Sequence, residues 1–72
     1  MISYLPFWET LKRSRHTTYT LITKHHISSS TIDRLRKGLP INTTTINDLC
    51  RVLQCRVEDV LVYIPSDEDQ LL

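Results

Sequence analysis

Residues able to bind a metal ion or carry redox chemistry are few in this sequence, and their spacing is unfavourable. Cys50 and Cys55 stand five positions apart, form no CxxC pair and have no histidines at zinc-finger distance. His16, His25 and His26 offer imidazoles for a metal site or a pH-sensitive switch, but no further partner stands at ligand spacing. We interpret the cysteines as packing residues and the histidines as surface or turn residues, with a disulfide or a metal site as the alternative.

Residue patterns typical of an enzyme are missing from the sequence. It contains no Ser/His/Asp set, no paired carboxylates and no glycine-rich phosphate loop with a pocket to occupy. We therefore expect neither catalysis nor a cofactor.

Hydrogen-bonding and basic side chains are concentrated in one stretch, residues 28–37, which reads SSSTIDRLRK. Charge is also divided along the chain, because residues 1–41 carry a net +5 whereas residues 42–72 carry a net −4. Such a division gives the molecule one face that attracts polyanions and another that repels them, although the total charge is only +1. The alternative is chance clustering on solvated surfaces.

The elements that position these side chains are expected to be helices. Pro6 opens the first helix, because proline is favoured in a first turn, and apolar residues keep helical spacing to about Ser14. A second helix, capped by the hydroxyl of Thr17 or Thr18, is expected to run through Leu21 and Ile22 to about Lys24 or His25.

Two further helices follow in the middle of the chain. Ser28 is the predicted N-cap of a third helix, Ser29–Lys37, and Gly38 supplies its C-terminal stop. Asn42 or Thr43 can cap a fourth helix. The apolar stripe of that fourth helix consists of Ile46, Leu49, Cys50 and Leu53.

A short fifth helix is expected just before Pro65, because the residue before proline avoids the helical region. Its apolar residues repeat at helical spacing: Val57, Val60, Leu61 and Ile64. We expect one domain over residues 1–65 and an acidic flexible tail over residues 66–72. As an alternative, the alternating stretches Ile2–Tyr4 and Val62–Ile64 could pair as short strands, within one chain or between two.

A helix, a turn of about four residues and a second helix follow one another over Thr17–Gly38, which is the anatomy of a helix-turn-helix. Leu21, Ile27, Ile32 and Leu35 are spaced to meet in a small core that fixes the angle between the two helices. The third helix then projects its N-terminal polar residues outward, and an α-helix fits the major groove of B-DNA. The whole predicted core consists of Trp8, Leu11, Leu21, Ile27, Ile32, Leu35, Ile46, Leu49, Cys50, Leu53, Val57, Val60 and Leu61.

Over residues 4–64 the chain resembles the Cro/repressor-type, or XRE-like, helix-turn-helix family, in particular its very short bacterial regulators. The stretches that carry the resemblance are Pro6-Phe7-Trp8, Ile27-Ser28-Ser29-Ser30-Thr31-Ile32, Leu49-Cys50-Arg51-Val52-Leu53 and Val57-Glu58-Asp59-Val60. The resemblance implies an all-α, five-helix, lambda-repressor-like DNA-binding domain and a transcriptional regulator, most often a repressor. His26 departs from the family, which usually has glycine there, and we expect a positive φ at a cost of about 1 kcal/mol.

Site residues follow from the same resemblance. It implies base contacts from the exposed face of the third helix, at Ser29, Ser30, Thr31 and Arg34. Arg34 is the strongest candidate, since a guanidinium can donate two hydrogen bonds to guanine O6 and N7, worth ~1–3 kcal/mol. The residues expected to contact phosphates are Thr18, Lys24, Ser28, Arg36, Lys37, Asn42, Thr43 and Thr44. Their alternative roles are helix capping and solubilising charge.

The expected partner is double-stranded DNA, bound at a palindrome by a homodimer that pairs through the fourth and fifth helices and the C-terminal region, including Tyr63 and Ile64. No membrane association is expected, because no apolar run approaches the ~20 residues that span a bilayer. The first six residues lack the features of a signal peptide, so we expect a cytoplasmic protein. The alternative function is a protein-interaction module, such as an antitoxin or antirepressor, built on the same fold.

Overall fold

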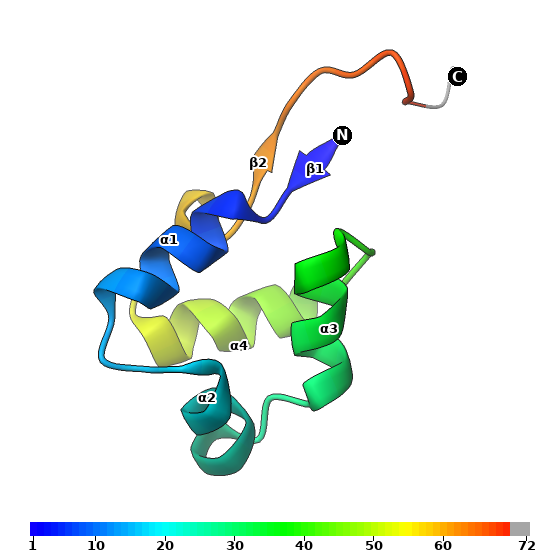
Figure 1. Ribbon diagram of the computed structural model, residues 1–72. Helices are drawn as coiled ribbons and strands as arrows, with labels where there is room; N and C mark the ends of the chain where they lie inside the picture. Colours follow the sequence, from blue (N-terminus) through cyan, green and yellow to red (C-terminus); the bar gives the residue numbers. More distant parts are fainter. Residues whose placement is uncertain (70–72) are drawn as a thin grey trace.

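The computed structural model describes residues 1–69. Most of these residues belong to four α-helices: α1 (Leu5–Arg13), α2 (Thr18–His25), α3 (Ser29–Lys37) and α4 (Thr43–Leu53). The remaining elements are a 3-10 helix, η1 (Val57–Asp59), and two short strands, β1 (Ile2–Ser3) and β2 (Val62–Tyr63). In Figure 1, α4 runs across the molecule with α1 above it and α2 below it, and α3 stands upright at one end.

Side-chain caps start three of the helices where the sequence predicts them. Thr17 and Thr20 form a capping box, in which each hydroxyl accepts a hydrogen bond from the other residue's backbone N–H, at 3.2 and 2.8 Å. Ser28 Oγ accepts the N–H of Thr31 at the start of α3. At the start of α4, Asn42 Oδ1 accepts the N–H of Thr45. These caps fix the helix starts locally because they satisfy N–H groups that have no partner within a helix.

Three of the helices end at a residue in the left-handed region. Gly38 ends α3 with φ 73°, as expected for a residue without a Cβ. His26 ends α2 with φ 60°, which confirms the positive φ predicted for this position. Gln54 ends α4 with φ 52°, a conformation that its sequence gives no reason to expect. After it, the N–H of Cys55 donates to the carbonyl of Cys50, so the chain turns back over the end of α4.

The core lies between the four helices and η1. Its nine buried residues are Tyr4, Phe7, Leu11, Leu21, Ile27, Ile32, Leu35, Leu49 and Val60. Four further residues of the predicted core are partly buried against this cluster, namely Trp8, Cys50, Leu53 and Leu61. Ile46 is half-buried and lies outside the cluster. Phe7 and Tyr4 were not in the predicted core, although Phe7 is fully buried at its centre.

The predicted fifth α-helix is wrong, because residues 57–64 form only the single turn of η1 before the chain extends into β2. The N–H of Ile64, which a longer helix would direct to Val60, donates instead to the carbonyl of Met1 at 2.7 Å, and two carbonyls at the end of η1 accept hydrogen bonds from α1. The hydroxyl of Thr10 donates to the carbonyl of Asp59 at 2.7 Å, and the N–H of Phe7 donates to that of Val60 at 3.1 Å. Val57, the first residue of η1, does not face the core as predicted and is 52% exposed.

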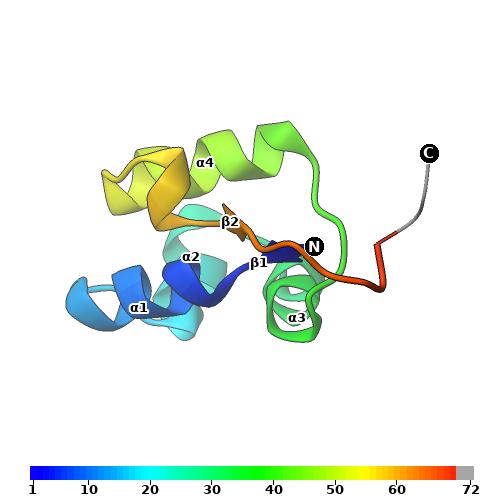
Figure 2. The ribbon, with the colours of Figure 1, turned by 90° about the horizontal axis from the view of Figure 1, so that it is seen from above.

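The extended chain after η1 pairs with the first residues instead. β1 and β2 are antiparallel, with Ile2 opposite Tyr63 and Ser3 opposite Val62. Figure 2 shows the two strands beside each other, so the two regions of alternating polarity pair within one chain. Beyond β2, the turn Ser66–Asp69 approaches the amino terminus, where Asp69 Oδ2 lies 2.7 Å from the Met1 ammonium. The last three residues of the predicted acidic tail lie outside the described part of the chain.

Candidate nucleic-acid interface

The segment between α2 and α3 is short and tightly bonded. The carbonyl of Leu21 accepts hydrogen bonds from the N–H groups of both His26 and Ile27, and Ser28 then caps α3. Four side chains hold the two helices together, since Leu21, Ile27, Ile32 and Leu35 are at most 6% exposed. The pair α2–α3 is therefore a helix-turn-helix whose interhelical angle is fixed by buried contacts.

Ile32 and Leu35 also decide which side chains of α3 face outward. At about 100° per residue, the direction opposite these two residues passes close to Ser30 and Lys37. Asp33 and Arg34 then lie on either side of that line, each about 50° away from it. The outward face of α3 thus carries hydroxyl, carboxylate, guanidinium and ammonium groups and no apolar side chain.

Hydroxyl groups form a connected cluster at the start of α3. Ser28 Oγ lies 3.1 Å from Ser30 Oγ and 2.9 Å from Thr31 Oγ1, and it also accepts the N–H of Thr31. Ser29 and Ser30 are exposed, while Thr31 is half-buried. The capping hydroxyl of Ser28 thereby orients two of the predicted base-reading side chains.

Arg34 is held in place in the free protein. Its Nη1 donates to the carbonyl of Pro40 at 3.2 Å. The side chain forms one wall of a hollow of about 510 Å³ between α3 and the start of α4, lined by Thr31, Arg34, Pro40, Ile41, Asn42 and Thr45. A guanidinium has five N–H donors, so the bond to Pro40 leaves donors for a ligand.

Tyr4 supports the same loop, and sequence reasoning did not assign it this role. Its side chain is 7% exposed, and its hydroxyl donates to the carbonyl of Leu39 at 2.8 Å. Tyr4 and Arg34 therefore hold two consecutive carbonyls of the segment that joins α3 to α4. The alternating pattern at Ile2–Tyr4 was the only sequence signal of its burial.

The residues predicted to contact phosphates occupy different environments. Thr18 is the first residue of α2, Ser28 and Asn42 are N-caps, and Thr43 and Thr44 form the exposed first turn of α4. Lys24 is exposed in the last turn of α2. Among residues 1–69, the first two N–H groups of α2, α3 and α4 donate to no protein atom, so three helix starts offer donors to an anion.

Two of the predicted phosphate-binding cations already have partners within the protein. The guanidinium of Arg36 lies over the ring of Trp8, 5.6 Å from its centroid, on the side of α3 that faces α1. Lys37 Nζ lies 3.0 Å from Asp33 Oδ2. Asp33 was counted in the charge balance but was not considered for the site.

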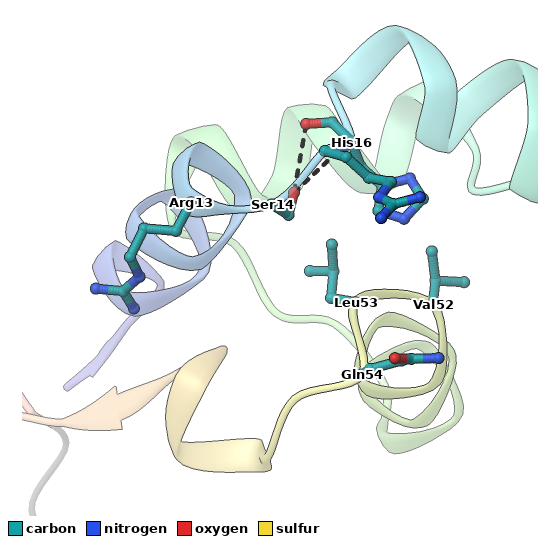
Figure 3. A pocket seen from close by; sticks show the side chains of 7 residues that line it. Arg13, Ser14, His16, Val52, Leu53 and Gln54 are labelled. Atoms are coloured by element: carbon teal, nitrogen blue, oxygen red, sulfur yellow. Dashed lines mark hydrogen bonds between the residues drawn. The ribbon is translucent and has the colours of Figure 1, made fainter.

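None of the histidines lines the hollow beside Arg34. The rings of His16 and His25 meet edge to face, with centroids 5.0 Å apart. Among residues 1–69, no group of three or more potential metal ligands comes together. His16 also borders a second hollow, of about 570 Å³, between the end of α1 and the end of α4 (Figure 3). In that hollow, Ser14 Oγ accepts the N–H of His16, which fixes the segment leading into α2.

The two cysteines are free thiols, and each is partly buried at the end of α4. The pKa of Cys55 is raised to about 11, mainly because the thiol is partly buried and to a smaller extent because Cys50 lies beside it. The Cys55 thiol therefore stays protonated near neutral pH, which fits a packing residue better than a reactive one.

Taken together, a fixed helix-turn-helix and a polar, partly basic outward face on α3 define a DNA-binding domain of the helix-turn-helix class. The family model described as the Cro/C1-type HTH DNA-binding domain matches residues 7–66, and the chain belongs to this family. Comparisons with characterised proteins and with solved structures gave no significant match. Within residues 1–69, every helix is too short or too polar to cross a bilayer.

Proposed function

We propose that this protein is a transcriptional repressor that inserts α3 into the major groove of double-stranded DNA in the cytoplasm. The observation that carries the proposal is the division of α3 into two faces. Ile32 and Leu35 are 3% and 2% exposed and anchor the helix, whereas Ser29, Ser30 and Arg34 are exposed to solvent. A partner protein would more often meet clustered aromatic or aliphatic side chains there, and this face has none.

Arg34 is the proposed principal base-reading residue. Its bond to Pro40 orders the guanidinium before DNA arrives, which lowers the entropy cost of forming a two-bond contact with guanine O6 and N7. Ser29, Ser30 and Thr31 would add contacts of lower selectivity, because a hydroxyl can donate or accept.

Phosphates on either side of the groove would be held by the helix starts and the flanking cations. This set comprises Thr18, Lys24, Ser28, Arg36, Lys37, Asn42, Thr43 and Thr44. In support, the first turns of α3 and α4 both line the hollow beside Arg34, so one stretch of the DNA backbone can reach both. For Arg36, phosphate contact would require weakening its contact with Trp8, whereas Lys37 could keep its ion pair with Asp33 and use its other N–H donors.

We also propose that the protein binds a palindromic site as a homodimer, with half-sites about 34 Å apart. The absence of a fifth α-helix moves the proposed pairing surface to the C-terminal region itself. Val62, Tyr63 and Ile64, in β2 and just after it, are each between 42% and 60% exposed, and exposed apolar surface often marks an interface. Sedimentation of the protein with and without its operator would measure the oligomeric state.

The proposed function is tested by selecting duplexes from a random pool and measuring binding by mobility shift. Arg34→Ala is expected to lose preference at one base position, at a cost of about 1–3 kcal/mol, whereas Lys24→Ala should weaken all sequences alike. Binding should also fall steeply as salt rises, because phosphate contacts release counterions. Salt-independent binding to a protein, with no selected duplex, would instead favour the antitoxin or antirepressor function.

A further inference from the structure

Asp33 occupies a position on α3 that the proposed DNA contacts have not used. It lies one turn after Ser29 on the outward face, about as far from the outermost line of the helix as Arg34 is on the other side. Its side chain is 48% exposed. We propose that Asp33 is a specificity-determining residue that accepts a hydrogen bond from the N4 amino group of cytosine. This inference rests on the proposed insertion of α3 into the major groove.

The chemistry of the base edges favours cytosine for a carboxylate. An ionised carboxylate only accepts hydrogen bonds. In the major groove cytosine presents the N4 donor, guanine presents the acceptors N7 and O6, and thymine presents the acceptor O4. Adenine presents a donor beside an acceptor. Asp33 should therefore prefer cytosine, tolerate adenine less well, and be repelled most strongly by guanine.

The ion pair with Lys37 makes a carboxylate tolerable on a face that meets phosphates. Lys37 Nζ lies 3.0 Å from Oδ2 of Asp33, one helical turn away, and offsets its charge. Oδ1 has no partner among residues 1–69, so one carboxylate oxygen is available for a base. The ammonium of Lys37 has three N–H donors, and two of them remain for the backbone.

Asp33 and Arg34 then form a complementary pair. Arg34 carries only donors and suits guanine, whereas Asp33 carries only acceptors and suits cytosine. Because the two residues lie on opposite sides of the outermost line of α3, they would meet different base pairs or different strands. The pair can reject sequences as well as select them, since a base with the wrong edge leaves a charge unpaired in the groove.

The test compares Asp33→Asn with a matched control, Asp48→Asn. Asp48 also forms an exposed ion pair within one helix, with Arg51 at 3.7 Å, so both variants remove one charge and one such pair. Each variant and the wild-type protein would be used to select duplexes from a random pool. Wild type and Asp48→Asn should prefer cytosine at one position by about 5- to 150-fold. Asp33→Asn should lose that preference and accept adenine, which a side-chain amide recognises.

A further variant separates the loss of a base contact from a loss of folded structure. Asp33→Glu keeps the acceptor and should keep the preference for cytosine, while circular dichroism confirms that all variants stay helical. Unchanged base preference in Asp33→Asn would overturn the assignment, as would a change shared with Asp48→Asn. If the wild-type protein selects no duplex at all, the proposed function itself fails. If it selects a site that Asp33→Asn reads identically, only the role of Asp33 is wrong.

Discussion

The helix-turn-helix and the terminal ribbon of β1 and β2 differ in how far apart their partners stand in the sequence. In the helix-turn-helix, Ser28 caps α3 through Thr31, and Leu21 closes the turn by accepting the N–H of Ile27. In the ribbon, Ile2 pairs with Tyr63. The first region can form from nearby residues, whereas the second requires the rest of the fold to bring the two ends together.

Removing a buried side chain from the first region should have the largest effect. Leu35→Ala deletes a side chain that is 2% exposed and should lower the free energy of unfolding by about 2–5 kcal/mol. Val62→Ala, in β2 and 42% exposed, should cost less than about 1 kcal/mol. Urea denaturation followed by circular dichroism measures both. Equal losses would mean that the ribbon contributes as much stability as the helix-turn-helix.

Substitutions at Gly38 and His26, which end α3 and α2, should change the free energy of unfolding by a smaller amount. Gly38→Ala should lower the free energy of unfolding by about 1 kcal/mol, because φ is 73°. A Cβ there would meet nothing within 4 Å, so the cost comes from the backbone alone. His26→Gly should raise stability by less than about 1 kcal/mol, since the relief at φ 60° is partly offset by the freer unfolded chain.

Gln54→Gly serves as the control for these two variants. Its φ of 52° predicts a similar small gain, but it lies outside the helix-turn-helix. It should therefore leave DNA binding unchanged. A stability loss in either glycine variant would show that the side chain of His26 or Gln54 makes a contact worth more than the backbone cost.

The smallest effect on stability is expected from the contact between Met1 and Asp69, at the open end of the ribbon. The hydrogen bond from the Met1 ammonium lowers the pKa of Asp69 below its ordinary value of 3.8. A depressed pKa in the folded state means that the carboxylate stabilises the fold above pH 3.8 and loses that contribution as the pH falls through the lower, folded value. NMR titration of Asp69 should show this lowered midpoint in the folded protein and 3.8 in urea. Identical midpoints would mean that the ammonium does not hold Asp69 in solution.

The same contrast explains what could be predicted from the sequence. The caps at Thr17, Ser28 and Asn42, and the positive φ at His26, are local features with known side-chain preferences. The helix-turn-helix followed from them and from the spacing of its apolar residues. For the candidate site, helical spacing indicated that Ser29, Ser30 and Arg34 are exposed, but Thr31 is half-buried and the outward-facing Asp33 was not considered.

The remainder depends on contacts between distant segments. Val57–Ile64 has a good helical pattern, but the N–H of Ile64 donates to Met1, and Thr10 and Phe7 of α1 donate to the carbonyls of Asp59 and Val60. No local signal reveals this competition. Likewise, the bond from Arg34 to Pro40 depends on the path of the loop after α3, which apolar spacing does not determine.

That loop has one further consequence. Because the carbonyls of Leu39 and Pro40 are held by Tyr4 and Arg34, the position of α4 relative to α3 depends on the same guanidinium that is proposed to read a base. The base contact of Arg34 and the phosphate contact of Asn42 should therefore be coupled. In a double-mutant cycle, the losses of DNA-binding free energy from substituting Arg34 and Asn42 should not be additive. A substitution of Arg34 that changes the base it reads would then require a compensating substitution in the loop. Residues 39–42 would therefore help to set the base preference of the protein.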